Sequence, residues 1–172
     1  YCMPVNTTGT ANVAMGSDTF YTNTTGDYNV AIGYNALTAT DTGTESVGIG
    51  HKALETQTDG YYNVALGSYA CQNLTSGYNN VALGSGAMRA TTTALSNTAV
   101  GHWALSAVTN QSGNVAVGYL AGEDLTAANN TLIGYEAGKE STSGADNTAV
   151  GYKALSNGIT TGSNNTVVGS QS

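Results

Sequence analysis

The amino-acid sequence predicts an all-β fold, a parallel β-solenoid of about ten coils with about 17 residues in each. A five-residue motif of the type Asn63-Val64-Ala65-Leu66-Gly67 occurs ten times at a nearly constant spacing, with one step shorter by a single residue and one step longer by a single residue. The coils start at Asn12, Asn29, Ser46, Asn63, Asn80, Asn97, Asn114, Asn130, Asn147 and Asn165. Since no shift in composition marks a boundary, we expect residues 1–172 to form one solenoid repeat domain.

The first five positions of the repeat, counted from its Asn, have the character of a short strand. Position 2 is Val or Thr and position 4 is Val, Ile, Leu or Met in all ten copies. Because side chains alternate across a strand, positions 2 and 4 form a bulky apolar face, and positions 1, 3 and 5 form a small one rich in Ala and Gly. Neither face is charged, so we expect both to be buried, the small one against backbone of the same or another chain. A charge placed at Val64 is then expected to be buried without a partner.

Position 5 is Gly in every copy, and we interpret these glycines as structural residues that end each strand at a corner. They are Gly16, Gly33, Gly50, Gly67, Gly84, Gly101, Gly118, Gly134, Gly151 and Gly169. Ala at position 8 and a large apolar residue at position 9 predict a second inward-facing segment, which Gly122 and Gly138 interrupt. Gly recurs at position 15, usually after Thr or Ser, and this predicts a turn in which Gly supplies a positive φ.

Charge and composition exclude several classes of function. The net charge is −7, and the basic residues are Lys52, Arg89, Lys139 and Lys153. Nucleic-acid binding requires a cationic surface, so we expect no nucleic-acid partner. The sequence contains no apolar run long enough to span a bilayer as a helix, so we expect no membrane insertion.

The sequence shows no catalytic constellation. Glu123 and Asp124 are neighbouring carboxylates, but general acid–base chemistry also requires a positioned partner. His51 and His102 share position 6 but lie three coils apart, about 14 Å at the spacing of strands. We therefore expect no enzyme, no cofactor and no metal site, with a calcium site in the acidic loop as an alternative.

Aromatic residues are the candidate ligand-binding groups. Tyr119, Tyr135 and Tyr152 occupy position 6 of successive coils, which predicts a ladder. Such a ladder stabilises neighbouring strands, the preferred interpretation, or presents amphipathic faces to sugars or proteins. Trp103, at position 7, is a candidate for a single exposed aromatic residue.

Threonine recurs at position 13, at Thr7, Thr24, Thr58, Thr75, Thr92, Thr109, Thr142 and Thr160. A file of Thr on a flat face could bind ice. Two outward files would be expected for that, and adjacent residues of a strand do not point the same way. Hydroxyls that stabilise turns are the simpler interpretation.

The repeat N-[VT]-A-[VILM]-G followed by x-x-A-L resembles the head repeats of YadA-type trimeric autotransporter adhesins. It is more similar to the variant of that repeat in tail fibres of phages and other viruses. The phrases that carry the resemblance are Gly33-Tyr34-Asn35-Ala36-Leu37 and Thr161-Gly162-Ser163-Asn164-Asn165-Thr166-Val167-Val168-Gly169, and it covers nearly the whole chain. The resemblance implies a left-handed β-roll, a homotrimer of parallel chains, and attachment to a host or surface through a glycan or protein receptor.

We therefore expect a structural and adhesive segment of a trimeric fibre, extracellular, on a virion or a bacterial cell surface. Cys2 and Met3 fall in register with positions 8 and 9 of a preceding coil, and Gly169 is followed by part of a coil. This predicts an excerpt of a longer fibre. The alternative is a monomeric solenoid that binds ice or a polysaccharide, which requires a flat face and capped ends.

Overall fold

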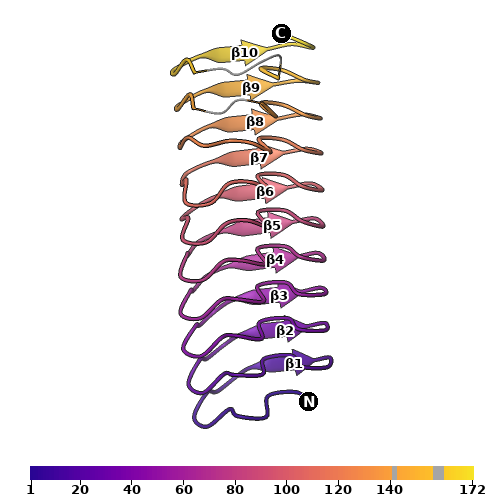
Figure 1. Ribbon diagram of the computed structural model, residues 1–172, viewed down its shortest axis with the longest axis vertical. Helices are drawn as coiled ribbons and strands as arrows, with labels where there is room; N and C mark the ends of the chain where they lie inside the picture. Colours follow the sequence, from indigo (N-terminus) through magenta and orange to yellow (C-terminus); the bar gives the residue numbers. More distant parts are fainter. Residues whose placement is uncertain (141–142, 157–160) are drawn as a thin grey trace.

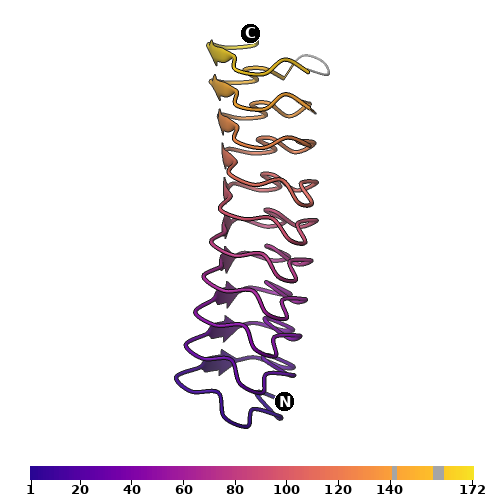
Figure 2. The same ribbon diagram turned by 90° about the vertical axis from the view of Figure 1, so that its left-hand side faces the viewer.

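A computed structural model of the chain describes residues 1–140, 143–156 and 161–172. Within them, ten strands of three residues form one parallel sheet in chain order (Figure 1). These are β1 (Val13–Met15), β2 (Val30–Ile32), β3 (Val47–Ile49), β4 (Val64–Leu66), β5 (Val81–Leu83), β6 (Thr98–Val100), β7 (Val115–Val117), β8 (Thr131–Ile133), β9 (Thr148–Val150) and β10 (Thr166–Val168). The strands stack in one column, and the rest of each coil folds back on the other side of the rod (Figure 2). The prediction of a parallel β-solenoid is confirmed, and so is the predicted length of its coils.

Every strand pairs with the next at the same positions of the repeat. Val64 lies opposite Val81, for example. The register persists across the shortened coil, where Val115 lies opposite Thr131, and across the lengthened coil between β9 and β10. Insertions and deletions are therefore accommodated outside the strands, and the side-chain columns continue from one end of the rod to the other.

The small face of each strand points into the coil, and the bulky face points outward. Ala65 is fully buried, whereas Val64 beside it is half-buried and Leu66 is 37% exposed. The expectation that both faces are buried is therefore wrong for a single chain, and a charge at Val64 would not be enclosed. The coil has little room at position 3 where position 9 carries a large side chain, since even a Cβ added to Gly48 would lie 3.2 Å from Cγ of Leu37. We call positions 2 and 4 of the ten strands the outer sheet face.

The predicted second inward-facing segment is confirmed. Position 9 contributes a buried column of Phe20, Leu37, Leu54, Cys71, Met88 and Leu105. The interruptions at Gly122 and Gly138 leave no hole, because Leu132 occupies the space in place of the usual Ala. A Cβ added to Gly122 would lie 2.8 Å from Cδ1 of Leu132, and one added to Gly138 would lie 2.6 Å from its Cδ2. The large Leu132 at position 3 thus compensates for the two glycines, Gly122 and Gly138, at position 9.

A ladder of asparagines at position 1, most of them buried, runs beside the strands, and its role was not predicted from the sequence. The side-chain amide of Asn80 donates to the carbonyl oxygen of Ala94 (2.8 Å), and its Oδ1 accepts the backbone N–H of Asn97 (3.0 Å). The same pair of bonds recurs at Asn12, Asn29, Asn63, Asn97, Asn114 and Asn147. Asn suits this position because its short side chain both donates and accepts. Each buried amide is thereby satisfied by the adjoining coil.

Close contact between coils explains the glycines at positions 5 and 15 of the repeat. Gly84, at position 5, has φ +136, and a Cβ there would lie 2.5 Å from the carbonyl oxygen of Gly101. The glycines at position 15, all within the described residues, do not have the positive φ that we expected. A Cβ on Gly60 would instead lie 2.6 Å from the carbonyl oxygen of Gly77. Lack of space, and not a special φ, explains the Gly at this place in the turn.

Candidate functional site

Aromatic rings at position 6 stack along one corner of the rod over four successive coils. The ring centroids of His102 and Tyr119 are 5.7 Å apart, those of Tyr119 and Tyr135 are 5.0 Å apart, and those of Tyr135 and Tyr152 are 5.4 Å apart. The rings are inclined to their neighbours by no more than 22°. A shorter stack of Tyr34 on His51 (5.6 Å) lies in the same column nearer the N-terminus.

This stacking determines what the predicted ligand-binding tyrosines offer. Because the rings cover one another face to face, Tyr119 and Tyr135 have neighbours on both faces. The 40–45% of Tyr119 and Tyr135 that remains exposed therefore consists mainly of ring edges and hydroxyls, whereas Tyr152, which is 47% exposed, ends the stack. A sugar could hydrogen-bond to this file, but it could not lie flat on the middle rings. The geometry favours a role in stabilising neighbouring coils.

Trp103 is half-buried and is packed differently from the ladder. Its ring lies over Gly86 in the preceding coil, where an added Cβ would be 3.2 Å from two ring atoms. The imidazole of His102 meets it nearly edge-on, at 5.8 Å and 72°. The guanidinium carbon of Arg89 lies 5.7 Å from its centroid. Trp103 was expected to be a single exposed aromatic residue, but it is half-buried and packs in a cluster with His102 and Arg89.

Charged residues at positions 7 and 10 form ion pairs beside the aromatic column. Nζ of Lys153 lies 3.2 Å from Glu136, and Nζ of Lys139 lies 3.8 Å from Glu123. Burial raises the pKa of Glu123, and the charge of Asp124 raises it further. Within the described part of the chain, no group of three His, Cys, Asp or Glu side chains could hold a metal ion.

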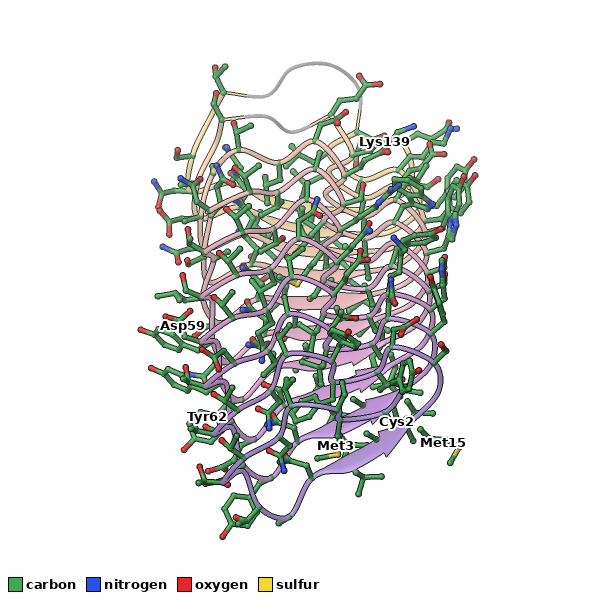
Figure 3. All side chains as sticks on the ribbon, turned by 60° about the horizontal axis from the view of Figure 1, so that its bottom comes forward. Cys2, Met3, Met15, Asp59, Tyr62 and Lys139 are labelled. Atoms are coloured by element: carbon green, nitrogen blue, oxygen red, sulfur yellow. The ribbon has the colours of Figure 1, made fainter. Side chains whose placement is uncertain are left out.

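Tyrosines at positions 16 and 17 line the opposite side of the coil, and sequence reasoning missed them. The rings of Tyr61 and Tyr78 stack at 4.8 Å and 4°. Asp59 and Tyr62 project from this side, away from Lys139 (Figure 3). A nearby open hollow of about 380 Å³ is lined by Tyr28, Glu45 and Val47. The recurrence of Tyr at adjacent positions of successive coils was the signal in the sequence.

The outer sheet face is uncharged in all ten described strands. Met15 of β1 projects away from the coil and is 62% exposed (Figure 3). In the middle of the rod, Leu66 and Leu83 are still 37% and 36% exposed. At the spacing of parallel strands the face extends for about 45 Å. An uncharged surface of this length, mainly apolar but with Thr at position 2 of β6, β8, β9 and β10, is typical of an interface with a partner.

The threonines at position 13 use their hydroxyls within the solenoid. Oγ1 of Thr75 donates to the carbonyl oxygen of Thr92 (3.0 Å), and Oγ1 of Thr92 donates to that of Thr109 (3.3 Å). Thr142 and Thr160 lie outside the described residues. Hydroxyls committed to the next coil support the turn-forming interpretation over an ice-binding one.

Both cysteines are free thiols, of which Cys2 is exposed and Cys71 is buried. Cys71 is fully enclosed in the position 9 column, and burial raises the pKa of its thiol to about 12. It therefore packs as a small apolar side chain. The described residues form no helix with the length and hydrophobicity needed to cross a bilayer.

No family model, curated protein or solved structure matches this chain.

Proposed function

We propose that this chain is a segment of a homotrimeric fibre, in which three left-handed β-rolls lie parallel and pack through their outer sheet faces. The fibre is extracellular, on a virion or a bacterial cell surface, and attaches to a glycan or protein on a host or other surface. One observation carries the proposal: every described strand presents uncharged side chains outward, and those in mid-rod remain more than one third exposed at Leu66 and Leu83. The number of chains comes from the resemblance of the repeat to trimeric adhesins.

The free energy of burial supports association along this face. Each apolar side chain transferred from water contributes about 25 cal/mol per Å² of area that becomes buried. The contribution is repeated in coil after coil, because the register does not drift. Repetition thus converts a small gain per coil into a long interface, and it aligns the chains in parallel.

Repetition also explains how such a fibre adheres. Coils bonded to one another through backbone and Asn side chains form a stiff rod. Columns such as His102–Tyr119–Tyr135–Tyr152 repeat across three chains, so weak contacts add through avidity. Attachment therefore needs no single tight pocket.

Two aspartate substitutions one residue apart test the interface. Ala65→Asp places a charge inside the coil and is expected to prevent folding of that region in any assembly. Val64→Asp places it on the outer sheet face, where a monomer would tolerate it. In a trimer, three carboxylates would be brought together in an apolar interface, and we expect dissociation into folded monomers.

The readouts are mass by light scattering and β-structure by circular dichroism. Asn73→Asp, on an exposed turn, is the matched control and should retain the parent mass. A Val64→Asp variant with the mass and melting temperature of the parent would contradict the proposed interface.

A further inference from the structure

Arg89 differs from the other basic residues in its electrostatic environment. Lys52, Lys139 and Lys153 each lie within 2.9–3.8 Å of a glutamate. Among the described residues, no carboxylate forms an ion pair with Arg89. Its Nε donates to Oε1 of Gln72 (3.1 Å), so the two terminal nitrogens of the guanidinium remain as donors.

Two aromatic rings hold this guanidinium in place. Its carbon lies 4.9 Å from the ring centroid of Tyr69 and 5.7 Å from that of Trp103. The two rings come from the coils on either side of the coil that carries Arg89, and Gly86 between them provides the space that the Trp103 ring occupies. Position 7 has a side chain in all the other coils, so this glycine marks a local change in the pattern.

The aromatic column at position 6 is interrupted at the same place. Ser68 and Ser85 stand where the neighbouring coils carry His51 and His102. Ser85 is exposed, and His51 contacts Tyr69 edge-on at 4.9 Å. In the coils of Tyr69 and Arg89, position 6 therefore carries a serine hydroxyl in place of an aromatic ring.

We propose that the cluster of Tyr69, Arg89 and Trp103, together with Ser68 and Ser85, binds the carboxylate of an acidic sugar. A guanidinium held between rings presents paired N–H donors that match a carboxylate. The aromatic rings contact the apolar side of the sugar, and the serine hydroxyls bond to its hydroxyl groups. The inference rests on the proposed attachment function and deepens it by naming a ligand class and a site.

The surroundings favour a sugar with one acidic group. The chain carries a net charge of −7, so a polyanion would be repelled. An extended acidic peptide is disfavoured, because it would bind by adding a strand to unpaired backbone groups of the protein. Here the backbone bonds to adjoining coils, as in Tyr69 N–H to the oxygen of His51 (2.8 Å) and Trp103 N–H to that of Ser85 (3.0 Å).

Trp103 is the only Trp of the chain, so its fluorescence reports on this site. We would titrate the intact segment with glucuronate, glucose and acetate, and repeat each titration by ligand-observed NMR. Glucuronate is expected to change the fluorescence saturably, while glucose and acetate bind at least tenfold more weakly. Equal binding of acetate would show a simple anion site and overturn the sugar assignment. Absence of any response to glucuronate would overturn the proposal as a whole.

Arg89→Gln tests the role of the cation. The variant is expected to weaken glucuronate binding by about tenfold or more, because a charged hydrogen-bond donor is lost. Lys139→Gln removes an equal charge at the same position of the repeat, three coils away from Arg89, and should bind like the parent. Unchanged affinity in Arg89→Gln would contradict the assignment. The mass of the chain in solution tests the fibre proposal separately. A monomer that binds glucuronate would contradict the fibre but support the sugar site. A trimer that does not bind glucuronate would support the fibre but contradict the sugar site.

Discussion

Leu132 and Gly138 provide the sharpest test of how this core is packed. Leu132 is fully buried, and its methyl groups occupy the space beside Gly122 and Gly138. Leu132→Ala would leave a cavity next to two residues that have no side chain to fill it. We expect a loss of about 4 kcal/mol in the free energy of unfolding, in the upper part of the range for buried leucines.

The reverse substitution, Gly138→Leu, should be harmful alone and harmless in combination. In the parent, the new side chain would collide with Leu132, and Leu would adopt the left-handed φ of +59. Overpacking of about 2 kcal/mol and backbone strain of about 1 kcal/mol predict a loss of about 3 kcal/mol. In the Leu132→Ala background the new side chain fills the cavity, as Leu37 fills the space beside Gly48, and Leu37 has a similar φ of +49. There we expect Gly138→Leu to cost nothing, a favourable coupling of about 3 kcal/mol.

The assay is denaturant unfolding at one protein concentration, for the parent, both single variants and the double variant. Leu37→Ala with Gly138→Leu is the matched control, because the two sites lie six coils apart and their effects should add. A loss of about 3 kcal/mol for Gly138→Leu in both the parent and the Leu132→Ala background would refute the compensation.

Three further predictions concern the corner, the ladder and the charges. Gly84→Val should lower the melting temperature strongly, because the new side chain would collide with Gly101 of the next coil. Ser85 is exposed, so Ser85→Val should be tolerated. Equal melting temperatures for the two variants would refute the register. Asn80→Ala should lower the free energy of unfolding by about 2–3 kcal/mol, because it leaves buried backbone groups unpaired. Asn73 is exposed, so Asn73→Ala should have little effect. Similar losses in denaturant unfolding of the two variants would count against the asparagine ladder. Burial raises the pKa of Glu55, but hydrogen bonds from Gln72, Lys52 and Asn35 lower it more, so its stabilising effect is present at neutral pH and is lost as pH falls below its ordinary pKa of 4.5. The pKa of Glu123 is raised, so its protonated form is favoured in the fold and its contribution is lost as pH rises. Thermal melts at pH 7 should show a lower melting temperature for Glu55→Gln and no decrease for Glu123→Gln. The Glu55→Gln difference should shrink as pH falls below 4.5, and the opposite order of the two variants at pH 7 would contradict these environments.

The repeat predicted where the strands lie because a constant period keeps equivalent residues in register. Which strand face points inward could not be predicted in the same way. Alternation separates Val64 and Leu66 from Ala65, but it does not state the width of the coil. A bulky apolar face is usually the inner one, and here the narrow interior accepts only the methyl group of Ala65.

Backbone conformation and cross-coil contacts were also hidden from sequence reasoning. Leu54 and Tyr62 have φ of +52 and +57, values that side chains of this size rarely adopt. Hydrogen bonds to the adjoining coils hold them there, as in Leu54 N–H to the oxygen of Ala70 (3.1 Å).

The tyrosine ladder could be predicted from the sequence, because its tyrosines occupy the same position of the repeat in successive coils. The contact of Arg89 with Tyr69 and Trp103 joins positions 7 and 10 of three coils. Only the glycine at Gly86, in a column of side chains, signalled this contact in the sequence.

The most direct test of the account is the solution mass of residues 1–172, measured by light scattering at several concentrations. We predict a stable trimer whose mass does not change on dilution, because the outer sheet face is then covered along its whole length. A folded monomer at every concentration would contradict the fibre proposal. It would mean that the outer sheet face is stable in water, and it would favour a monomeric solenoid that binds ice or a polysaccharide.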